Sequence, residues 1–178
     1  YPRPDPRNRD IHCTVINPEI IQRIKELEIL PTIFGPYVYY HGDKLIPAFG
    51  EERLEWMFAA RSFLDANVII SAHSDHPCAP YPPLMAIHGL VNRLTKSGKP
   101  IGQSQKITVM EALKLYTINA AFHSFDEDIL GSIEEGKLAD LVVLGEDILT
   151  VKPEHIMNIP IEMTLVDGKI VYKRDSNE

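Results

Sequence analysis

The stretch Val68-Ile-Ile-Ser-Ala-His-Ser-Asp-His-Pro77 predicts the fold around it. It starts with a continuous apolar run, which is typical of a strand buried on both faces of a parallel sheet. Side chains alternate along a strand, so Ser71, His73 and Asp75 would share one face if the extended geometry continued that far. We therefore expect a buried strand over 68–73 that carries polar side chains at its carboxyl end.

Strand-like and helical patterns alternate around this stretch. In chain order we expect a strand at 11–16, a helix from Asn17, a strand at 29–34, an aromatic loop at 37–50, a helix at 51–66, the strand at 68–73, and helices at 84–94, from 108 and at 119–125. Asn17-Pro18 and Thr108 with Glu111 are the start signals of two of these helices. The alternation predicts an α/β fold with a parallel sheet or barrel wall. Three strands are too few to close a (β/α)₈ barrel.

The pattern changes near Asp126. Short strands follow, among them the apolar run Ala139–Leu144 and two strands joined by Asp167-Gly168, a strong hairpin signal. We therefore expect two parts, a partial barrel over 1–125 and a β-rich segment over 126–178.

Composition excludes several functional classes. The chain has 178 residues, 44% of them hydrophobic and 24% charged, as in globular proteins. A net charge of −7 without a basic stripe argues against a nucleic-acid partner. No apolar run is long enough to cross a membrane. Cys13 and Cys78 lie far apart and are expected to be reduced, mostly buried thiols of a cytoplasmic protein. The start at Tyr1, followed by prolines, suggests an excerpt of a longer protein or a processed terminus.

Two residues are the first candidates for chemistry. His12 lies in the first strand and Asp75 follows the third, and strand ends of this kind face the active site in β/α barrels. An imidazole and a carboxylate suit zinc, which lowers the pKa of bound water to about 7. Asp75 could be a ligand and a general base. The alternatives are a hydrogen-bonded core histidine and a turn or cap aspartate.

Four segments resemble the amidohydrolase superfamily, most closely its amidohydrolase 3 branch of YtcJ-like metal-dependent hydrolases. They are Asp10-Ile-His-Cys13, His73-Ser-Asp-His-Pro77, Thr117-Ile-Asn-Ala-Ala121 and Gly131-Ser-Ile-Glu-Glu-Gly-Lys-Leu-Ala-Asp-Leu-Val-Val-Leu144. The last is the most specific, and in that superfamily it marks the return of the chain from the barrel into a flanking β-sandwich. The resemblance spans nearly the whole chain.

The resemblance implies a TIM barrel with a metal centre that hydrolyses amide or related C–N bonds. His12 resembles the metal-binding histidine of barrel strand six, and Asp75 resembles the metal-binding and catalytic aspartate of strand eight. The three strands would then be strands six to eight, followed by strands of a small β-sandwich domain. No H-x-H motif and no counterpart of strands one to five occur in the chain. With only two ligands, the isolated chain is expected to hold no metal tightly and to be inactive.

Further residues are expected to contact the substrate, a small molecule with an amide or related C–N bond. These are Tyr39 and His41 in the aromatic segment and His73 beside Asp75. His88, His123 and His155 are expected to be structural. We expect a hydrolase that forms a homo-oligomer and binds a divalent metal, zinc, in a full-length parent. Two alternatives stay open: a non-catalytic fragment that associates with a partner chain, and a metal-free module that binds small molecules.

Overall fold

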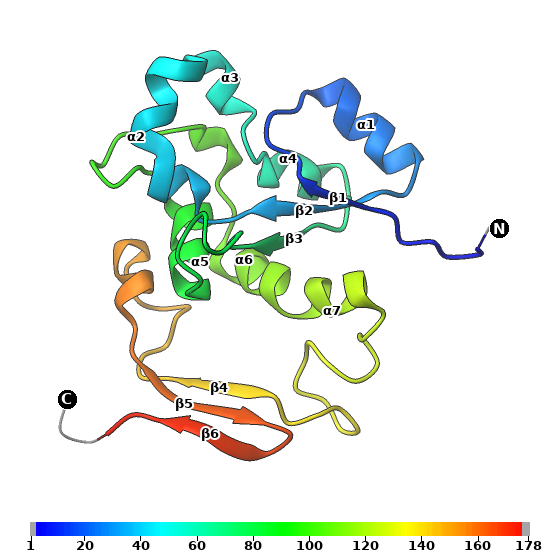
Figure 1. The fold of residues 1–178 in the computed structure, drawn as a ribbon, viewed down its shortest axis with the longest axis vertical. Helices are drawn as coiled ribbons and strands as arrows, with labels where there is room; N and C mark the ends of the chain where they lie inside the picture. Colours follow the sequence, from blue (N-terminus) through cyan, green and yellow to red (C-terminus); the bar gives the residue numbers. More distant parts are fainter. Residues whose placement is uncertain (1–2, 176–178) are drawn as a thin grey trace.

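The computed structural model describes residues 3–175 and contains a three-stranded parallel sheet in the order β1-β2-β3 (Figure 1). Its strands are β1 Arg9–His12, β2 Leu30–Phe34 and β3 Ser71–His73. The register aligns His12 with Ile33, and Phe34 with His73, so the three strands end close to one another. The α/β architecture and the parallel pairing agree with the expectation from sequence.

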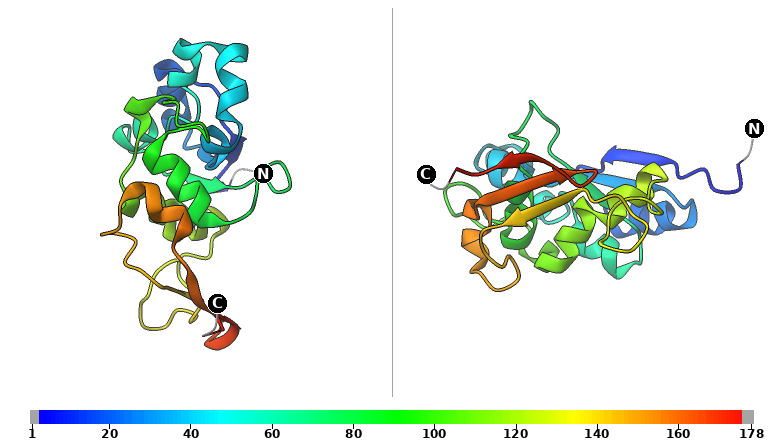
Figure 2. Two further views of the ribbon diagram at one scale, coloured as in Figure 1. Left: turned by 90° about the vertical axis from the view of Figure 1, so that its left-hand side faces the viewer. Right: turned by 90° about the horizontal axis from the view of Figure 1, so that it is seen from below.

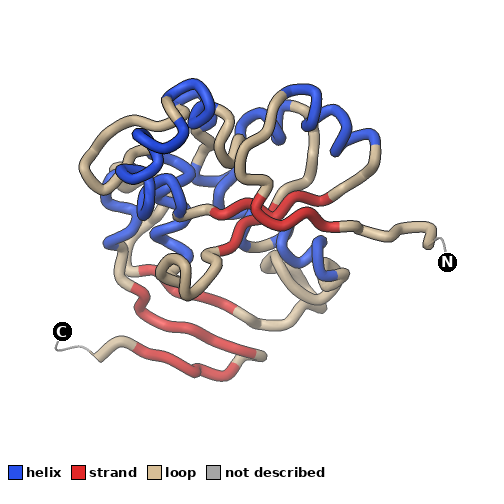
Figure 3. The backbone as a smooth tube through the Cα atoms, turned by 45° about the horizontal axis from the view of Figure 1, so that its top comes forward, coloured by secondary structure: helices blue, strands red, loops and turns tan. Residues whose placement is uncertain are grey.

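Helices pack around the parallel sheet. They are α1 Pro18–Glu26, α2 Tyr37–Phe49, α3 Glu51–Glu55, α4 Ala60–Asp65, α5 Pro83–Asn92, α6 Val109–Tyr116 and α7 Ile118–Ser124, with short 3₁₀ helices η1 Gln103–Gln105 and η2 Pro153–Asn158. In Figure 1, α1 to α3 lie above β1, and α5 to α7 lie below β3, between this sheet and a second one (Figures 1 and 3). No helix in the described range 3–175 is long and apolar enough to span a membrane.

Two helix starts follow the capping signals in the sequence. The Asn17 side chain accepts a hydrogen bond from the Ile20 amide at 2.8 Å, with Pro18 in the first turn of α1. Thr108 and Glu111 form a reciprocal capping box at α6, because each side chain binds the backbone amide of the other residue. Both predicted helix starts are confirmed.

The segment 37–50 is helical, so the predicted aromatic loop is wrong. Val38, Gly42 and Leu45 are buried and recur at helical spacing along α2. Gly42 lies so close to Thr95 and Ile101 that a β-carbon there would clash with their side chains. The glycine and the internal Pro47 are loop signals in isolation. Here the glycine allows close packing, and tertiary burial outweighs the local signals.

The predicted helix at 51–66 is interrupted after α3. Phe58 has a left-handed φ of 48°, and its amide donates to the Thr14 carbonyl at 3.0 Å. Val15 forms an isolated bridge with Met57. Pairing with the chain that follows β1 therefore replaces helical hydrogen bonds between α3 and α4. The strand predicted over 11–16 is also different in the structure, because β1 ends at His12 and the residues that follow it are not part of the strand.

A second sheet is built from the C-terminal residues. Strands β4 Leu141–Leu144, β5 Ile161–Val166 and β6 Lys169–Lys173 pair antiparallel in that order. Asp167 and Gly168 both have positive φ, at 49° and 72°, as a two-residue hairpin turn requires, so the predicted hairpin is confirmed. Apolar side chains on this sheet remain exposed, among them Val142, Ile170 and Val171.

The main core lies between the parallel sheet and its helices. Its largest fully buried side chains include Ile33, Met57, Phe58, Phe63 and Leu115. This packing fixes the strands, and thereby the positions of the residues at their carboxyl ends.

Candidate metal centre

Three metal-binding side chains converge at the carboxyl ends of the parallel strands. His12, His73 and Asp75 each offer a ligand atom, and these atoms lie within 4.8 Å of one another. His12 Nε2 is 3.4 Å from Asp75 Oδ2. The side chains of His12 and Asp75 are 42% and 40% exposed, so the cluster opens to solvent on one side. The sequence predicted that His12 and Asp75 lie close together. It predicted a contact with the substrate for His73, and not a place among the candidate metal ligands.

Backbone turns bring the three side chains together. His12 ends β1 with a left-handed φ of 81°, and His73 ends β3. Asp75 has a φ of 53° and lies in a turn closed by a 2.7 Å hydrogen bond from the Cys78 amide to the Asp75 carbonyl. The extended geometry considered for 71–75 therefore stops at His73. Ser71 does not join the cluster, because it binds His123 and Thr32.

The aromatic ring of Phe34 supports both imidazoles. Its centroid lies 6.2 Å from that of His12 and 5.3 Å from that of His73, and the two imidazole centroids are 5.0 Å apart. The His73 carbonyl accepts hydrogen bonds from the Gly35 amide and from the Tyr116 hydroxyl. Strand β2 therefore positions the ligands contributed by its two neighbours.

One nitrogen of each imidazole in this cluster lacks a hydrogen-bond partner among residues 3–175. These atoms are Nε2 of His12 and Nε2 of His73, which are shielded from solvent, and His12 Nε2 is within ion-pair distance of Asp75. Burial lowers the pKa of His73 below its usual value, the nearby His12 lowers it further, and Asp75 opposes the shift. A neutral imidazole with an unused lone pair is the form that binds a metal ion.

The cluster fits a divalent transition metal by donor type and spacing. Zinc binds imidazole nitrogen and carboxylate oxygen at about 2.0–2.2 Å in a tetrahedral arrangement, which places two ligand atoms about 3.4 Å apart. The distance of 3.4 Å between His12 Nε2 and Asp75 Oδ2 matches this spacing. His73 offers a third donor, so the described residues offer three candidate ligands, one more than the sequence predicted and the number of protein ligands found in catalytic zinc sites.

The residues predicted to contact substrate lie in different surroundings. His41 in α2 binds the Cys78 carbonyl through Nε2 at 3.0 Å, above the turn that contains Asp75. Tyr39 packs edge-on against His88 of α5, with ring centroids 5.0 Å apart. Within residues 3–175, Tyr39 forms no hydrogen bond and no ring contact with the cluster, and its role in substrate binding stays a prediction.

The other histidines and the cysteines take part in local packing. His88 is buried beside Asn92, His123 binds Ser71 and the Ile69 carbonyl, and His155 pairs with Glu146. Cys13 is a buried thiol bonded to Asp10, whereas Cys78 is exposed. The expectation that both thiols are buried is wrong for Cys78, because its loop projects from the body of the molecule (Figure 2).

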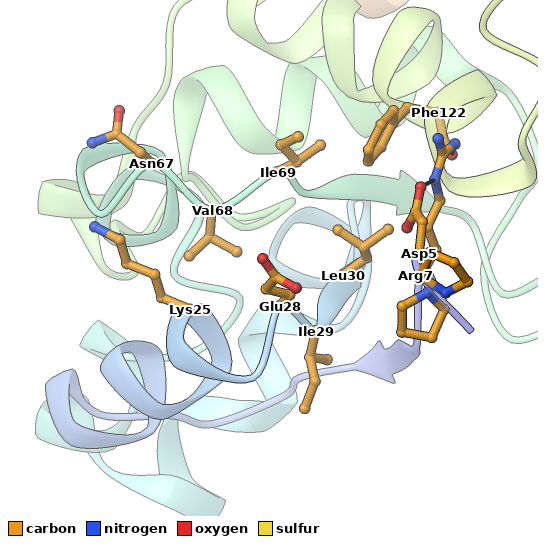
Figure 4. A pocket seen from close by; sticks show the side chains of 12 residues that line it. Asp5, Arg7, Lys25, Glu28, Ile29, Leu30, Asn67, Val68, Ile69 and Phe122 are labelled. Atoms are coloured by element: carbon orange, nitrogen blue, oxygen red, sulfur yellow. Dashed lines mark hydrogen bonds and ion pairs between the residues drawn. The ribbon is translucent and has the colours of Figure 1, made fainter. Parts of the chain in front are cut away.

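A cavity of about 430 Å³ lies at the opposite end of the parallel strands. Its lining comes from the segments that lead into β1, β2 and β3, including Arg7, Ile29 and Ile69, together with Phe122 of α7 (Figure 4). Arg7 lies over the Phe122 ring and pairs with Glu127. Because the strands are parallel, this cavity is far from their carboxyl ends, so we assign the chemistry to the His12, His73 and Asp75 cluster.

Comparison with known proteins identifies the family of the chain and agrees with its fold. The family model described as "Amidohydrolase family" matches residues 1–172. The chain belongs to the amidohydrolase family. Over 118 residues it is 40% identical to an N-substituted formamide deformylase from Arthrobacter pascens, covering 66% of this chain and 22% of the relative. Over 176 residues it is 29% identical to the putative amidohydrolase YtcJ of Bacillus subtilis, covering 97% and 33%.

Solved structures of this fold are also similar. A metal-dependent hydrolase from Pyrococcus horikoshii superimposes with a TM-score of 0.73 at 24% identity, over 84% of this amidohydrolase chain and 31% of the other. At this identity the similarity shows the shared fold alone. The chain spans about a fifth to a third of the length of these relatives.

Proposed function

We propose that the protein is a metal-dependent hydrolase that cleaves carbon–nitrogen bonds, other than peptide bonds, in small molecules. The observation that carries this proposal is the convergence of His12, His73 and Asp75, with 3.4 Å between His12 Nε2 and Asp75 Oδ2. Two partnerless imidazole nitrogens beside a carboxylate are costly to bury unless a ligand satisfies them. Family membership supports the same chemistry.

This chain supplies the C-terminal part of the enzyme in our proposal. Strands β1, β2 and β3 would be strands six to eight of a TIM barrel, within a domain over 1–125. Strands β4, β5 and β6, within 126–178, would belong to a small β-sandwich. Within 3–175, β1 and β3 each have one edge without a paired strand, and unpaired edges favour association. The remaining barrel strands would cover these edges and contribute further ligands.

The proposed chemistry uses a divalent metal, which we take to be zinc. When bound, the metal would lower the pKa of a coordinated water to about 7 and polarise the substrate carbonyl. His12 and His73 would hold the ion through Nε2, and Asp75 through one carboxylate oxygen. Asp75 would also accept the proton of the attacking water and return it to the leaving nitrogen. Phe34 would keep the two imidazoles in place.

The substrate class follows from the chemistry and from one relative. The relative from Arthrobacter pascens is named an N-substituted formamide deformylase, and an N-substituted formamide is a small amide of the proposed kind. We infer that this protein takes small amides of that type, and that it acts in the cytoplasm as a homo-oligomer. His41 and Tyr39 in α2 would lie on the substrate side of the barrel.

The test compares the full-length protein with residues 1–178 alone. Each is loaded with Zn²⁺, and formate release from N-substituted formamides is measured together with bound metal per chain. We expect the full-length protein to bind one or two metal ions and release formate, and residues 1–178 alone to release none. If the full-length protein binds no divalent metal, the proposal of a metal-dependent hydrolase is refuted. That result would favour the alternative of a non-catalytic chain whose sheet edges bind a partner.

A further inference from the structure

We propose that His41 is a positioning residue that clamps the turn containing Asp75, and that it does not itself contact the substrate. This inference rests on the proposed function. It concerns the turn over 75–78 that follows β3 and the helix α2 that follows β2. Both segments lie at the carboxyl ends of the parallel strands.

The backbone of Cys78 connects His41 to Asp75. The Cys78 amide donates to the Asp75 carbonyl at 2.7 Å, which closes the turn. The Cys78 carbonyl lies 3.0 Å from His41 Nε2, so a protonated Nε2 donates to it. His41 Nε2 is also 4.0 Å from the Cys78 thiol. The backbone amide of Cys78 is therefore bound to Asp75, and its backbone carbonyl is bound to His41 of α2.

The clamp has a physical purpose because Asp75 is in an uncommon backbone conformation. Its φ of 53° lies in the left-handed region, which few residues other than glycine occupy, although aspartate tolerates it better than most. Such conformations persist at functional sites only when the surrounding structure holds them. The loop carrying this turn projects from the body of the protein (Figure 2).

The His41 ring is itself held in place by the same helix. Its centroid lies 4.8 Å from the Tyr37 ring and 4.9 Å from the Tyr40 ring. Tyr37 packs in turn on Phe34, whose ring supports His12 and His73. The connected rings of Phe34 and Tyr37 therefore support the imidazoles of His12 and His73 and also the His41 ring. Through His41 they hold the turn that contains Asp75. Ala79, next along the chain, is buried and gives the loop a second attachment.

The proposal is tested with His41→Ala and His41→Gln in the full-length protein. Glutamine can donate to the Cys78 carbonyl from nearly the same position as Nε2. His155→Ala is the matched control, because it removes another hydrogen-bonded histidine far along the chain. The measurements are amide hydrogen exchange over 75–79, affinity for Co²⁺, and the kinetic constants for the formamide.

We expect His41→Ala to raise exchange at the Cys78 amide at least tenfold, to weaken Co²⁺ binding, and to lower kcat with little change in KM. His41→Gln should restore most of each property, and His155→Ala should change none. Unchanged exchange in His41→Ala would overturn the clamp, as would a raised KM at unchanged kcat. If the wild-type protein hydrolyses nothing, the proposed function fails. In that case hydrogen exchange at the Cys78 amide, compared between His41→Ala, His41→Gln and His155→Ala, still tests the clamp.

Discussion

His12 Nε2 and Asp75 Oδ2 lie 3.4 Å apart, although His12 ends the first strand of the parallel sheet and Asp75 lies in the turn after the third. Strand β2 separates them, and its Phe34 ring packs against His12 and against His73. The strand ends therefore form one site from residues that are distant in sequence. This is how β/α folds place catalytic groups at the carboxyl edge of their sheets.

The capping box of α6 should contribute measurably to stability. Replacing Thr108 with alanine removes the hydroxyl that accepts from the Glu111 amide, while Glu111 keeps its ion pair with Arg61. We expect a loss of about 1 kcal/mol in the free energy of unfolding, measured by urea denaturation. Thr108→Ser retains the hydroxyl and should remain within a few tenths of a kcal/mol of wild type. Equal losses in both variants would contradict a capping role.

Arg93 is a second point at which stability should depend on one side chain. It is 1% exposed and donates to the carbonyls of Met57, Phe58, Ile101 and Gly102. Burial lowers its pKa to about 10, so it stays charged near neutral pH. Arg93→Met should cost on the order of 3 kcal/mol, because several buried carbonyls lose their donor. An unfolding free energy close to wild type would show that water replaces the guanidinium.

His123 should make the stability of the protein depend on pH. It is buried against Ser71 and the Ile69 carbonyl, and burial lowers its pKa below the usual value, aided by Arg9 and Arg7. As the pH falls below about 6.5, the unfolded chain takes up a proton that the folded chain does not. The stabilising contribution is therefore complete above that pH and declines below it.

Thermal unfolding between pH 7.5 and 5.5 measures this effect. We expect the melting temperature to fall over the range, and to fall less in His123→Gln than in wild type. His88 and His73 also have lowered pKa values, so part of the dependence should remain in the variant. His155→Gln changes an exposed histidine and serves as the control. A slope in His123→Gln equal to that of wild type would contradict the assignment.

The sequence predicts most of the strands and helices because their signals are local. Capping at Asn17 and Thr108 and the turn at Asp167-Gly168 each depend on a few neighbouring residues, whereas the strand predicted over 68–73 is shorter in the structure, where β3 spans Ser71–His73. The helix α2 was missed because Gly42 and Pro47 are typical of loops, while burial against Thr95 and Ile101 is a long-range effect. The break before α4 was missed for the same reason, since it depends on pairing with Thr14.

The candidate site was predicted in part. The sequence brought His12 and Asp75 together through the ends of parallel strands, which is a rule of the fold. It did not identify His73 as a ligand candidate, although its position two residues before Asp75 was a usable signal. A turn at Asp75 was one of the alternatives, but the contact of that turn with His41 of α2 joins segments distant in sequence and could not be predicted.

The most direct test of the central claim is hydrolysis by Asp75→Asn in the metal-loaded, full-length protein. Asparagine preserves the size of the side chain but removes the charge that binds metal and accepts a proton. We predict that kcat for an N-substituted formamide falls by about 10²–10⁴-fold while the melting temperature stays within a few degrees of wild type. Substantial hydrolysis by a folded Asp75→Asn protein would contradict the role of Asp75 and the proposed metal centre.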